Sequence, residues 1–415
     1  MSNKYKPESL MMTHGYKPEL SEGAIKCPIF QTSTFVFKSA EEGKSFFEIA
    51  YGLREKKQDE ELGLIYSRIN NPNLEILENR LSLWDDSDDS AVFESGMSAI
   101  STVMLEFLKP GDLILYSSPT YGGTDHFIQD FLPKIGVESA IFHPEHSEEE
   151  IAEIIRKTGK ADRLGLIYIE TPANPTNTVI DIEMCRRVAD KFKNGDEKTY
   201  LCVDNTYMGP VWSKPISVGA DLVVYSATKF IGGHSDLIAG AVMAKADLML
   251  RIKTLRTFLG NMVSPHTAWL LLRSLETLKI RMERQCESAQ KVAKYLNDHS
   301  KIEKVMYLGL LKESDPSYEV YKRQYNSPGA MISFYIQGGE KEAFTFLNNL
   351  KLVKLAVSLG STESLAQHPA TMTHCAVDSE EKARIGVNEK LVRLSIGVED
   401  ADDLINDFEQ ALDKV

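Results

Sequence analysis

Long apolar runs are absent from this sequence of 415 residues, and so is an excess of basic side chains. No stretch reaches the roughly 18 apolar residues that a membrane-spanning helix needs, and the first residues are polar where a secretory signal would be apolar. The formal net charge is −13, whereas a nucleic-acid-binding protein needs a basic surface to meet phosphates. We therefore expect a cytoplasmic protein whose partners include no membrane and no nucleic acid.

Paired cysteines are also missing. The five cysteines are scattered and form no CxxC motif: Cys27, Cys185, Cys202, Cys286 and Cys375. This spacing argues against a disulfide framework and against a zinc site. We expect buried free thiols, a reducing compartment and no bound metal.

What the sequence does contain is a change of pattern near residue 74. Before it, helices and strands do not clearly alternate, and the charged residues at 48–63 indicate a solvated loop or short helix. Leu74, Leu77, Leu81 and Trp84 then recur at helical spacing. Short apolar runs follow, and we interpret them as buried strands at 91–93, 113–116, 164–169, 201–203 and 222–225. Such strands, with a helix at 181–193 among them, predict an α/β domain with a mainly parallel sheet.

The pattern changes again after residue 265. One long helical stretch, 266–299, is typical of a connector. Strands at 331–336 and 391–396, a helix at 340–349 and a terminal helix follow it, which predicts a smaller C-terminal α/β domain. We expect an N-terminal arm at 1–65, a large α/β domain at 66–264, and the connector with the C-terminal domain at 265–415.

Polar residues directly follow several of the predicted strands, where open parallel sheets bind ligands. Strand 201–203 ends in Asp204, and strand 222–225 leads to Lys229. A lysine amine can form a Schiff base with an aromatic aldehyde, and a carboxylate can pair with the ring nitrogen of the same cofactor. Taken singly, each residue has an ordinary alternative, since lysines at strand ends are commonly solvated and aspartates there commonly cap helices.

A second feature suits a phosphate. Strand 91–93 runs into a Gly96-Met97 turn that should open a helix, whose free backbone N–H groups and positive dipole end attract anions. Ser226 and Thr228 could add hydroxyl donors. By itself the Gly-Met signal is equally well explained as a tight turn.

Together these segments resemble the Cys/Met-metabolism (trans-sulfuration) family of pyridoxal-phosphate (PLP) enzymes. The matching motifs are 28–35 (PIFQTSTF), 66–72 (YSRINNP), 94–97 (ESGM), 121–124 (YGGT), 170–175 (ETPANP), 203–206 (VDNT), 226–229 (SATK), 264–266 (SPH), 358–360 (SLG), 368–374 (HPATMTH) and 392–397 (VRLSIG). The resemblance implies the PLP-dependent transferase fold type I, which is aspartate-aminotransferase-like, with pyridoxal 5'-phosphate as the cofactor. It also implies an obligate homodimer, commonly paired into a homotetramer.

The resemblance assigns roles around the cofactor ring. Lys229 would be the Schiff-base lysine and the carrier of the Cα and Cβ protons. Asp204 would hold the ring nitrogen, Asn174 would bond the ring hydroxyl oxygen, and Tyr121 would stack on the ring and assist proton transfer.

Further roles concern the phosphate and the substrate. Gly96, Met97, Ser226 and Thr228 would bind the phosphate, and Tyr66 and Arg68 would complete that site from a neighbouring subunit. Arg393 would bind the substrate α-carboxylate with two parallel hydrogen bonds, helped by Ser358. Without the resemblance, Arg393 would be interpreted as a surface arginine in a strand.

The choice of reaction depends on the far end of the pocket, because family members share chemistry at the ring. Val357 stands where cystathionine-handling members usually carry a glutamate, and residues 363–369 resemble methionine γ-lyases. These features favour γ-elimination on methionine or a related sulfur amino acid, giving 2-oxobutanoate, ammonia and a thiol. Against this, Gly123 replaces a cysteine typical of those lyases, and Arg256-Thr257 aligns with a typical Lys-Asp pair.

Several alternatives therefore stay open. Within the family they are γ-replacement on an O-acylhomoserine, as in cystathionine γ-synthase or homoserine sulfhydrylase, and cystathionine γ-lyase activity. Outside it they are a PLP aminotransferase of related fold, and a binding or regulatory protein that has lost activity.

Overall fold

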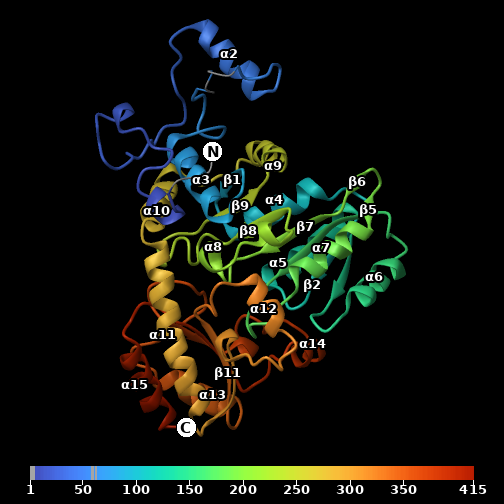
Figure 1. Ribbon diagram of the computed structural model, residues 1–415, viewed down its shortest axis with the longest axis vertical. Helices are drawn as coiled ribbons and strands as arrows, with labels where there is room; N and C mark the ends of the chain where they lie inside the picture. Colours follow the sequence, from blue (N-terminus) through green and yellow to red (C-terminus); the bar gives the residue numbers. More distant parts are fainter. Residues whose placement is uncertain (1–4, 58–59, 61–62) are drawn as a thin grey trace.

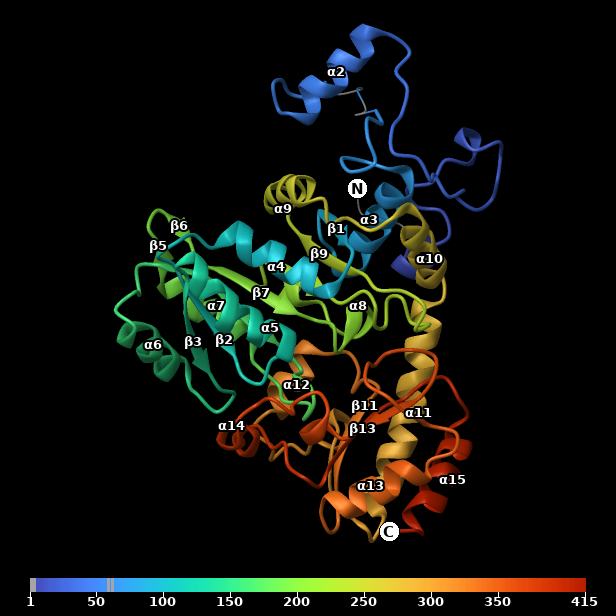
Figure 2. The same cartoon turned by 180° about the vertical axis from the view of Figure 1, so that it is seen from behind.

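The computed structural model describes residues 5–57, 60 and 63–415, so part of the charged stretch predicted at 48–63 lies outside the described residues. Before that stretch, helix α2 (Ala40–Ala50) stands away from the body of the molecule (Figures 1 and 2). After α2 the chain is held in place by Arg54. The Arg54 guanidinium forms ion pairs with Glu48 at 3.3 Å and with Glu60 at 2.5 Å. The described part of the predicted loop is thus tied to the helix by ion pairs.

The core of the molecule is a sheet of seven strands. In spatial order they are β1 (Asp89–Phe93), β9 (Gly240–Ala244), β8 (Leu222–Tyr225), β7 (Tyr200–Asp204), β4 (Leu164–Glu170), β2 (Leu113–Ser117) and β3 (Glu138–Phe142). Only β9 runs antiparallel to its neighbours, β1 and β8. The five predicted strands are all present in this mainly parallel sheet, while β3 and β9 were not predicted.

Helices cover both faces of this sheet. Successive side chains of a strand point to opposite faces, so apolar residues on both faces are buried against helices. Phe93 packs with α4 (Gly96–Phe107) and α9 (Ala246–Leu259), whereas Val92 joins the core formed with α3 (Pro72–Asp85) and α7 (Ile182–Lys191). Helix α6 (Glu148–Lys157) packs on the same side as α7. The helix predicted around 74–84 is present as α3. The helix predicted at 181–193 is present but ends at Lys191, and Lys193 already belongs to a short strand; Asp181 caps α7 by accepting from Met184 N–H at 3.2 Å.

A second sheet of five strands follows in the C-terminal part. Its spatial order is β10 (Ile302–Met306), β11 (Met331–Ile336), β14 (Leu391–Ser395), β13 (Leu365–Gln367) and β12 (Lys354–Leu355). The pairing is antiparallel except between β12 and β13. Helices α13 (Glu340–Asn349) and α15 (Ala401–Leu412) pack against each other, and α11 (Leu278–Asp298) packs against α15 and β10. This smaller unit lies below the seven-stranded sheet in Figure 1.

The connector is two helices, so the prediction of one helix at 266–299 is wrong. Helix α10 (Pro265–Leu275) ends before Thr277, and α11 (Leu278–Asp298) continues down the side of the molecule. The break has a physical cause, because the carbonyl oxygen of Ser274 accepts from Arg281 Nη2 at 3.0 Å and from Thr277 N–H at 3.3 Å. That carbonyl bonds the arginine side chain and a residue only three positions ahead.

Several short α-helices and strands lie before or between these elements. They are α1 (Pro7–Leu10), α5 (Gly122–His126), α8 (Gly209–Trp212), α12 (Tyr318–Gln324), α14 (Ser379–Arg384), β5 (Lys193–Asn194) and β6 (Glu197–Lys198). All five cysteines are free and four are buried, but Cys375 is exposed, which corrects the expectation of a buried thiol there.

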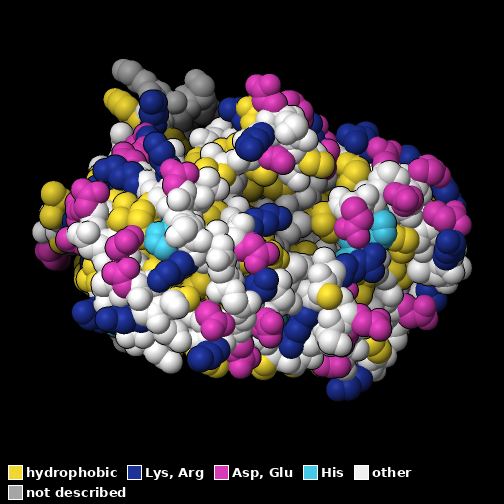
Figure 3. All heavy atoms as spheres, turned by 90° about the horizontal axis from the view of Figure 1, so that it is seen from below, with side chains coloured by type: hydrophobic (Ala, Val, Ile, Leu, Met, Phe, Trp, Pro, Cys, Tyr) yellow, Lys and Arg dark blue, Asp and Glu magenta, His cyan; other side chains and the backbone are white. Residues whose placement is uncertain are grey.

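Among the described residues, no helix is both long and apolar enough to cross a membrane, and no cluster of His, Cys, Asp or Glu could hold a metal ion. On the face shown in Figure 3, acidic and basic side chains are interspersed.

Candidate cofactor site

A cavity of about 340 Å³ opens at the carboxyl ends of β1, β7 and β8. The C-terminal part of the chain contributes its opposite wall through Val357, Ser358 and Arg393. Every predicted site residue except Tyr66 and Arg68 lines it: Gly96, Met97, Tyr121, Asn174, Asp204, Ser226, Thr228, Lys229, Val357, Ser358 and Arg393. The structure thus brings together residues from segments almost 300 positions apart. The parallel sheet gathers those at its strand ends, and the C-terminal part packs over them.

Lys229 projects into this cavity from the turn after β8. Its Nζ donates to Ser358 Oγ at 2.7 Å. Burial, and next the positive charge of Arg393, lower the pKa of Lys229 to about 8. The amine is therefore more readily deprotonated than a solvated lysine, which suits a nucleophile toward an aldehyde.

Ser358 is held in an unusual backbone conformation. Its φ of 87° lies in the left-handed region, which is rare for residues other than glycine. In this conformation its hydroxyl meets Lys229 while its carbonyl oxygen accepts from Arg393 Nη2 at 2.5 Å. The backbone strain at Ser358 therefore accompanies contacts to two of the predicted site residues.

Asp204 ends strand β7 and is buried within the cavity wall. Its carboxylate accepts from Tyr168 OH at 2.9 Å and from Thr206 N–H at 3.0 Å. Burial raises the pKa of the Asp204 carboxyl. Among the described residues, no Lys, Arg or His side chain forms an ion pair with it. A buried carboxylate without a cation is costly, so this position would be stabilised by a protonated ring nitrogen.

Glu170 is a second buried carboxylate, and it is not among the predicted site residues. It ends β4 in register with Asp204, and it accepts from Tyr121 N–H at 2.6 Å and Asn174 N–H at 3.1 Å. Burial, and next the charge of Asp204, raise the pKa of Glu170 to about 8. Glu170 thereby holds the backbone of two residues predicted to contact the ring. Its place at a strand end, like that of Asp204, is the signal that could have identified it.

The N-terminus of α4 faces the cavity beside Ser226. Ser95 caps this helix by accepting from Ser98 N–H at 3.0 Å. A Cβ added to Gly96 would lie 2.8 Å from Ser226 Cβ, so only glycine allows this approach. The predicted turn therefore opens a helix, and its free N–H groups lie next to the Ser226 and Thr228 segment.

Arg393 is 2% exposed, which overturns its interpretation as a surface residue. Its Nη1 donates to Asn174 Oδ1 at 2.9 Å, but its buried Nε has no hydrogen-bond partner among the described residues. Burial lowers the pKa of Arg393 to about 10, so it remains protonated at neutral pH. The hydroxyl of Tyr207 is likewise buried in the cavity wall without a described partner.

Tyr121 is half exposed and leans over Gly123. A Cβ at position 123 would lie 2.7 Å from Tyr121 Cε1 and 3.2 Å from Met97 Sδ. The glycine that departs from the methionine γ-lyase pattern therefore leaves the space that the tyrosine ring occupies.

Tyr66 and Arg68 do not line the cavity of their own chain. Tyr66 is 41% exposed, and Arg68 donates through Nη1 to the carbonyl oxygen of Thr257 at 2.8 Å. Both side chains are thus presented on the surface, away from Lys229.

Two observations bear on the choice of reaction. Val357 and Ile238, an apolar residue that no sequence signal indicated, both line the cavity with exposed side chains. Arg256, which departs from the methionine γ-lyase pattern, is not at the cavity: it is 3% exposed and bonds Glu78 and the carbonyl oxygen of Val92 behind β1. Its difference from those lyases therefore does not change the part of the pocket wall that its own chain forms.

These features fit pyridoxal phosphate. The residues present offer an amine for the aldehyde, an unpaired carboxylate for the ring nitrogen, and helix N–H groups with hydroxyls for the phosphate. The partnerless Nε of Arg393 adds a buried donor that a carboxylate would satisfy.

Comparisons with known proteins agree with this geometry. A family described as "Cys/Met metabolism PLP-dependent enzyme" matches residues 8–413. The L-methionine gamma-lyase of Fusobacterium nucleatum subsp. nucleatum is 40% identical over 395 residues, covering 95% of this chain and 94% of its own. The cystathionine gamma-lyase of Bacillus subtilis is 35% identical over 411 residues, covering 99% and 100%. The crystal structure of MetB from Corynebacterium glutamicum superposes with a TM-score of 0.86 at 34% identity, covering 99% of this chain and 98% of that one. The predicted fold type I is thereby confirmed, and the chain belongs to the Cys/Met-metabolism family of PLP-dependent enzymes.

Proposed function

We propose that this enzyme catalyses γ-elimination on L-methionine, giving 2-oxobutanoate, ammonia and methanethiol. The apolar residues of the cavity wall carry the proposal. Val357 and Ile238 both line the cavity. The charged groups among the described lining residues are Glu170, Asp204, Lys229 and Arg393, all of them at the proposed ring and carboxylate sites. A methyl thioether is compatible with such a wall, whereas the distal ammonium and carboxylate of cystathionine would lack partners.

Bound pyridoxal phosphate supplies an aldehyde for amines and a ring that withdraws electrons from the substrate Cα. Lys229 would hold the cofactor, and its Nζ would take the Cα proton after the substrate amine displaces it. Asp204 would hold the ring nitrogen, Asn174 the ring hydroxyl, and Tyr121 would stack on the ring. The same Lys229 amine would move a Cβ proton so that the thiolate leaves Cγ.

The anion sites are proposed in the same way. Gly96 and Met97 N–H groups, with Ser226 and Thr228, would bind the phosphate. Arg393 would bind the substrate α-carboxylate through donors that Asn174 and Ser358 leave free.

The phosphate site would be completed in an oligomer. The exposed Tyr66 and Arg68 would reach the phosphate of a neighbouring subunit, which requires a homodimer, and we propose that two dimers pair as a homotetramer. We also propose the division into an arm at 1–65, a large domain at 66–264 and a connector with C-terminal domain at 265–415, and a cytoplasmic location.

The test is release of 2-oxobutanoate from methionine by PLP-loaded enzyme without an added thiol. We expect rapid release from wild type and none from Lys229→Ala, which lacks both the anchoring amine and the proton carrier. Near-normal turnover by Lys229→Ala would contradict the role of this lysine. No release by the wild type would contradict γ-elimination.

A second candidate is γ-replacement on an O-acylhomoserine, favoured by Gly123 and the position of the Tyr121 ring above it. The same assay separates the two. An enzyme that is silent with methionine but forms a thioether from O-acetylhomoserine or O-succinylhomoserine and cysteine would be a γ-replacement enzyme.

A further inference from the structure

Strand β1 forms one edge of the seven-stranded sheet and pairs only with β9. Backbone groups on its free side bond side chains and a loop. Val92 N–H donates to Glu78 Oε1 at 3.1 Å, and the Val92 carbonyl oxygen accepts from Arg256 Nη1 at 2.9 Å. The Glu78–Arg256 ion pair thus supplies both hydrogen-bond partners that a neighbouring strand would provide to Val92: Glu78 is the acceptor and Arg256 is the donor.

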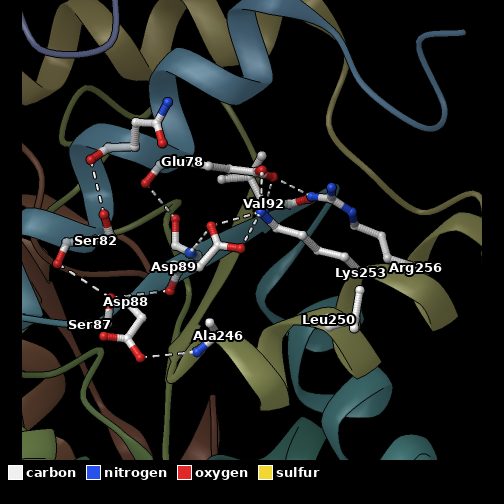
Figure 4. Close-up of polar contacts among 12 residues, drawn as sticks. Glu78, Ser82, Ser87, Asp88, Asp89, Val92, Ala246, Leu250, Lys253 and Arg256 are labelled. Carbon is white, nitrogen blue, oxygen red and sulfur yellow. Dashed lines mark hydrogen bonds and ion pairs between the residues drawn. The ribbon is translucent and has the colours of Figure 1, made fainter. Parts of the chain in front are cut away.

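The ion pair is buried and reinforced. Arg256 Nη1 lies 2.5 Å from Glu78 Oε1, and Lys253 Nζ lies 3.2 Å from Glu78 Oε2 and 2.7 Å from Asp89. Figure 4 shows Lys253 and Arg256 of α9 converging with Glu78 of α3 on Val92. Burial acts to raise the pKa of Glu78, but the two cations outweigh it and the pKa is lowered, so Glu78 stays ionised.

Just beyond Val92, the same strand becomes the turn at the cavity. Glu94 N–H donates to the carbonyl oxygen of Asn261 at 3.0 Å, which extends the edge contacts toward Ser95 and Gly96. The turn at Ser95 and Gly96 has little room to move, because it is closely packed on both sides. A Cβ on Gly240 would lie 2.1 Å from the Ser95 carbonyl oxygen, and Gly96 already approaches Ser226 closely. The direction in which β1 leaves the sheet therefore determines where the first N–H groups of α4 point.

We propose that the Glu78–Arg256 ion pair is a positioning device that aligns the α4 N-terminus with the phosphate of the cofactor. This inference rests on the proposed phosphate site at Gly96, Met97, Ser226 and Thr228. Neither Glu78 nor Arg256 lines the cavity, so both act through the edge of β1. Loss of the pair should weaken recognition of the phosphate while leaving the aldehyde and ring contacts in place.

The experiment compares two probes that differ only in the phosphate. Dissociation constants of PLP and of pyridoxal are measured on the apo-protein, from the visible absorbance of the lysine-bound aldehyde. In Arg256→Met we expect the preference for PLP over pyridoxal to fall about tenfold, the size of one hydrogen bond to a charged group. The affinity for pyridoxal should stay unchanged, and Arg256→Lys should retain most of the preference.

A matched control is the Arg186–Asp221 pair, which also supports a strand. Arg186 Nη1 lies 2.7 Å from Asp221 Oδ2, and that carboxylate accepts from Leu201 N–H at 2.9 Å near the start of β7, away from the cavity. Arg186→Met should lose stability in thermal unfolding without changing the preference for PLP. An equal loss of preference in Arg186→Met and Arg256→Met would overturn the proposal, because general destabilisation would then explain both.

Ser226→Ala distinguishes failure of this inference from failure of the proposed site. If Ser226→Ala lowers the preference while Arg256→Met keeps the wild-type value, the positioning role is wrong and the phosphate site stands. If both variants keep the wild-type preference, the phosphate site itself is wrong and the inference fails with it. Should Arg256→Met not fold, Glu78→Gln tests the same contact with nearly unchanged size, and a wild-type preference there would overturn the proposal.

Discussion

Arg393→Leu tests the proposed carboxylate site most directly. The guanidinium has five N–H donors, and the structure assigns one to Asn174 Oδ1 and one to the Ser358 carbonyl oxygen, leaving the buried Nε and one hydrogen on each terminal nitrogen. Two of these can meet a carboxylate in parallel. At about 1.5 to 3 kcal/mol for each hydrogen bond to a charged group, their loss should lower kcat/KM for methionine by about 10²- to 10⁴-fold.

The assay is a binding cycle alongside steady-state kinetics. Methionine is compared with 3-(methylthio)propylamine, which keeps the amine and thioether but lacks the carboxylate, as ligands of the wild type and of Arg393→Leu. The variant should lose affinity for methionine alone, and Arg393→Lys should be intermediate because it keeps the charge but not the paired geometry. An equal loss for both ligands, or an unchanged KM for methionine, would refute the carboxylate role. Thermal unfolding of each variant controls for the buried acceptors that the substitution leaves unpaired.

Other predictions address specificity and pH. Val357→Glu should raise kcat/KM for cystathionine by about fivefold, because a half-exposed ion pair contributes about 1 kcal/mol. The rate of 2-oxobutanoate release from cystathionine and from methionine measures this change. An equal gain in Val357→Gln would show that the charge is not the cause. The rate at which apo-protein captures PLP should rise with pH around a midpoint of about 8, since only the neutral Lys229 amine attacks the aldehyde. That midpoint should move upward in Arg393→Leu, and an unchanged midpoint there would count against the interaction of the two charges. Asp85, buried and bonded to Tyr225 OH, has its pKa raised to about 7 chiefly by burial. Because this folded pKa lies above the unfolded value of 3.8, the stability it contributes is present below the unfolded pKa and is lost as pH rises to about 7. Asp85→Asn should therefore gain up to about 4 kcal/mol relative to wild type over that range in chemical unfolding, and a constant difference between the two proteins would refute this.

The sequence predicted strands that are uninterrupted apolar runs and missed strands whose residues do not form such a run. Strands β2, β4, β7 and β8 are uninterrupted apolar runs because helices cover both of their faces. By contrast, β3 lies at the far edge and has two exposed residues, so its run is broken. Strand β9 begins at Gly240, where the chain needs close contact with Ser95, and it contains alanine and methionine, which favour helices.

The predicted site residues were identifiable for a related reason. Asp204 and Lys229 stand at the ends of buried strands, at the edge where parallel sheets bind ligands, and the resemblance to the family suggested their roles. What the sequence could not reveal is how side chains meet across distant segments. The contact of Lys229 with Ser358, and the presence of Ile238 and Val357 in one cavity wall, depend on how the C-terminal part packs over the sheet.

The ion pair along β1 has a consequence for the protein in solution. The backbone of an uncovered edge strand can pair with a strand of another molecule and so start aggregation. With the Val92 N–H and carbonyl oxygen already bonded by Glu78 and Arg256, and Glu94 N–H by Asn261, β1 has few free groups for such pairing. The charged side chains that hold the edge also keep the sheet from growing by one more strand taken from a second copy of the chain.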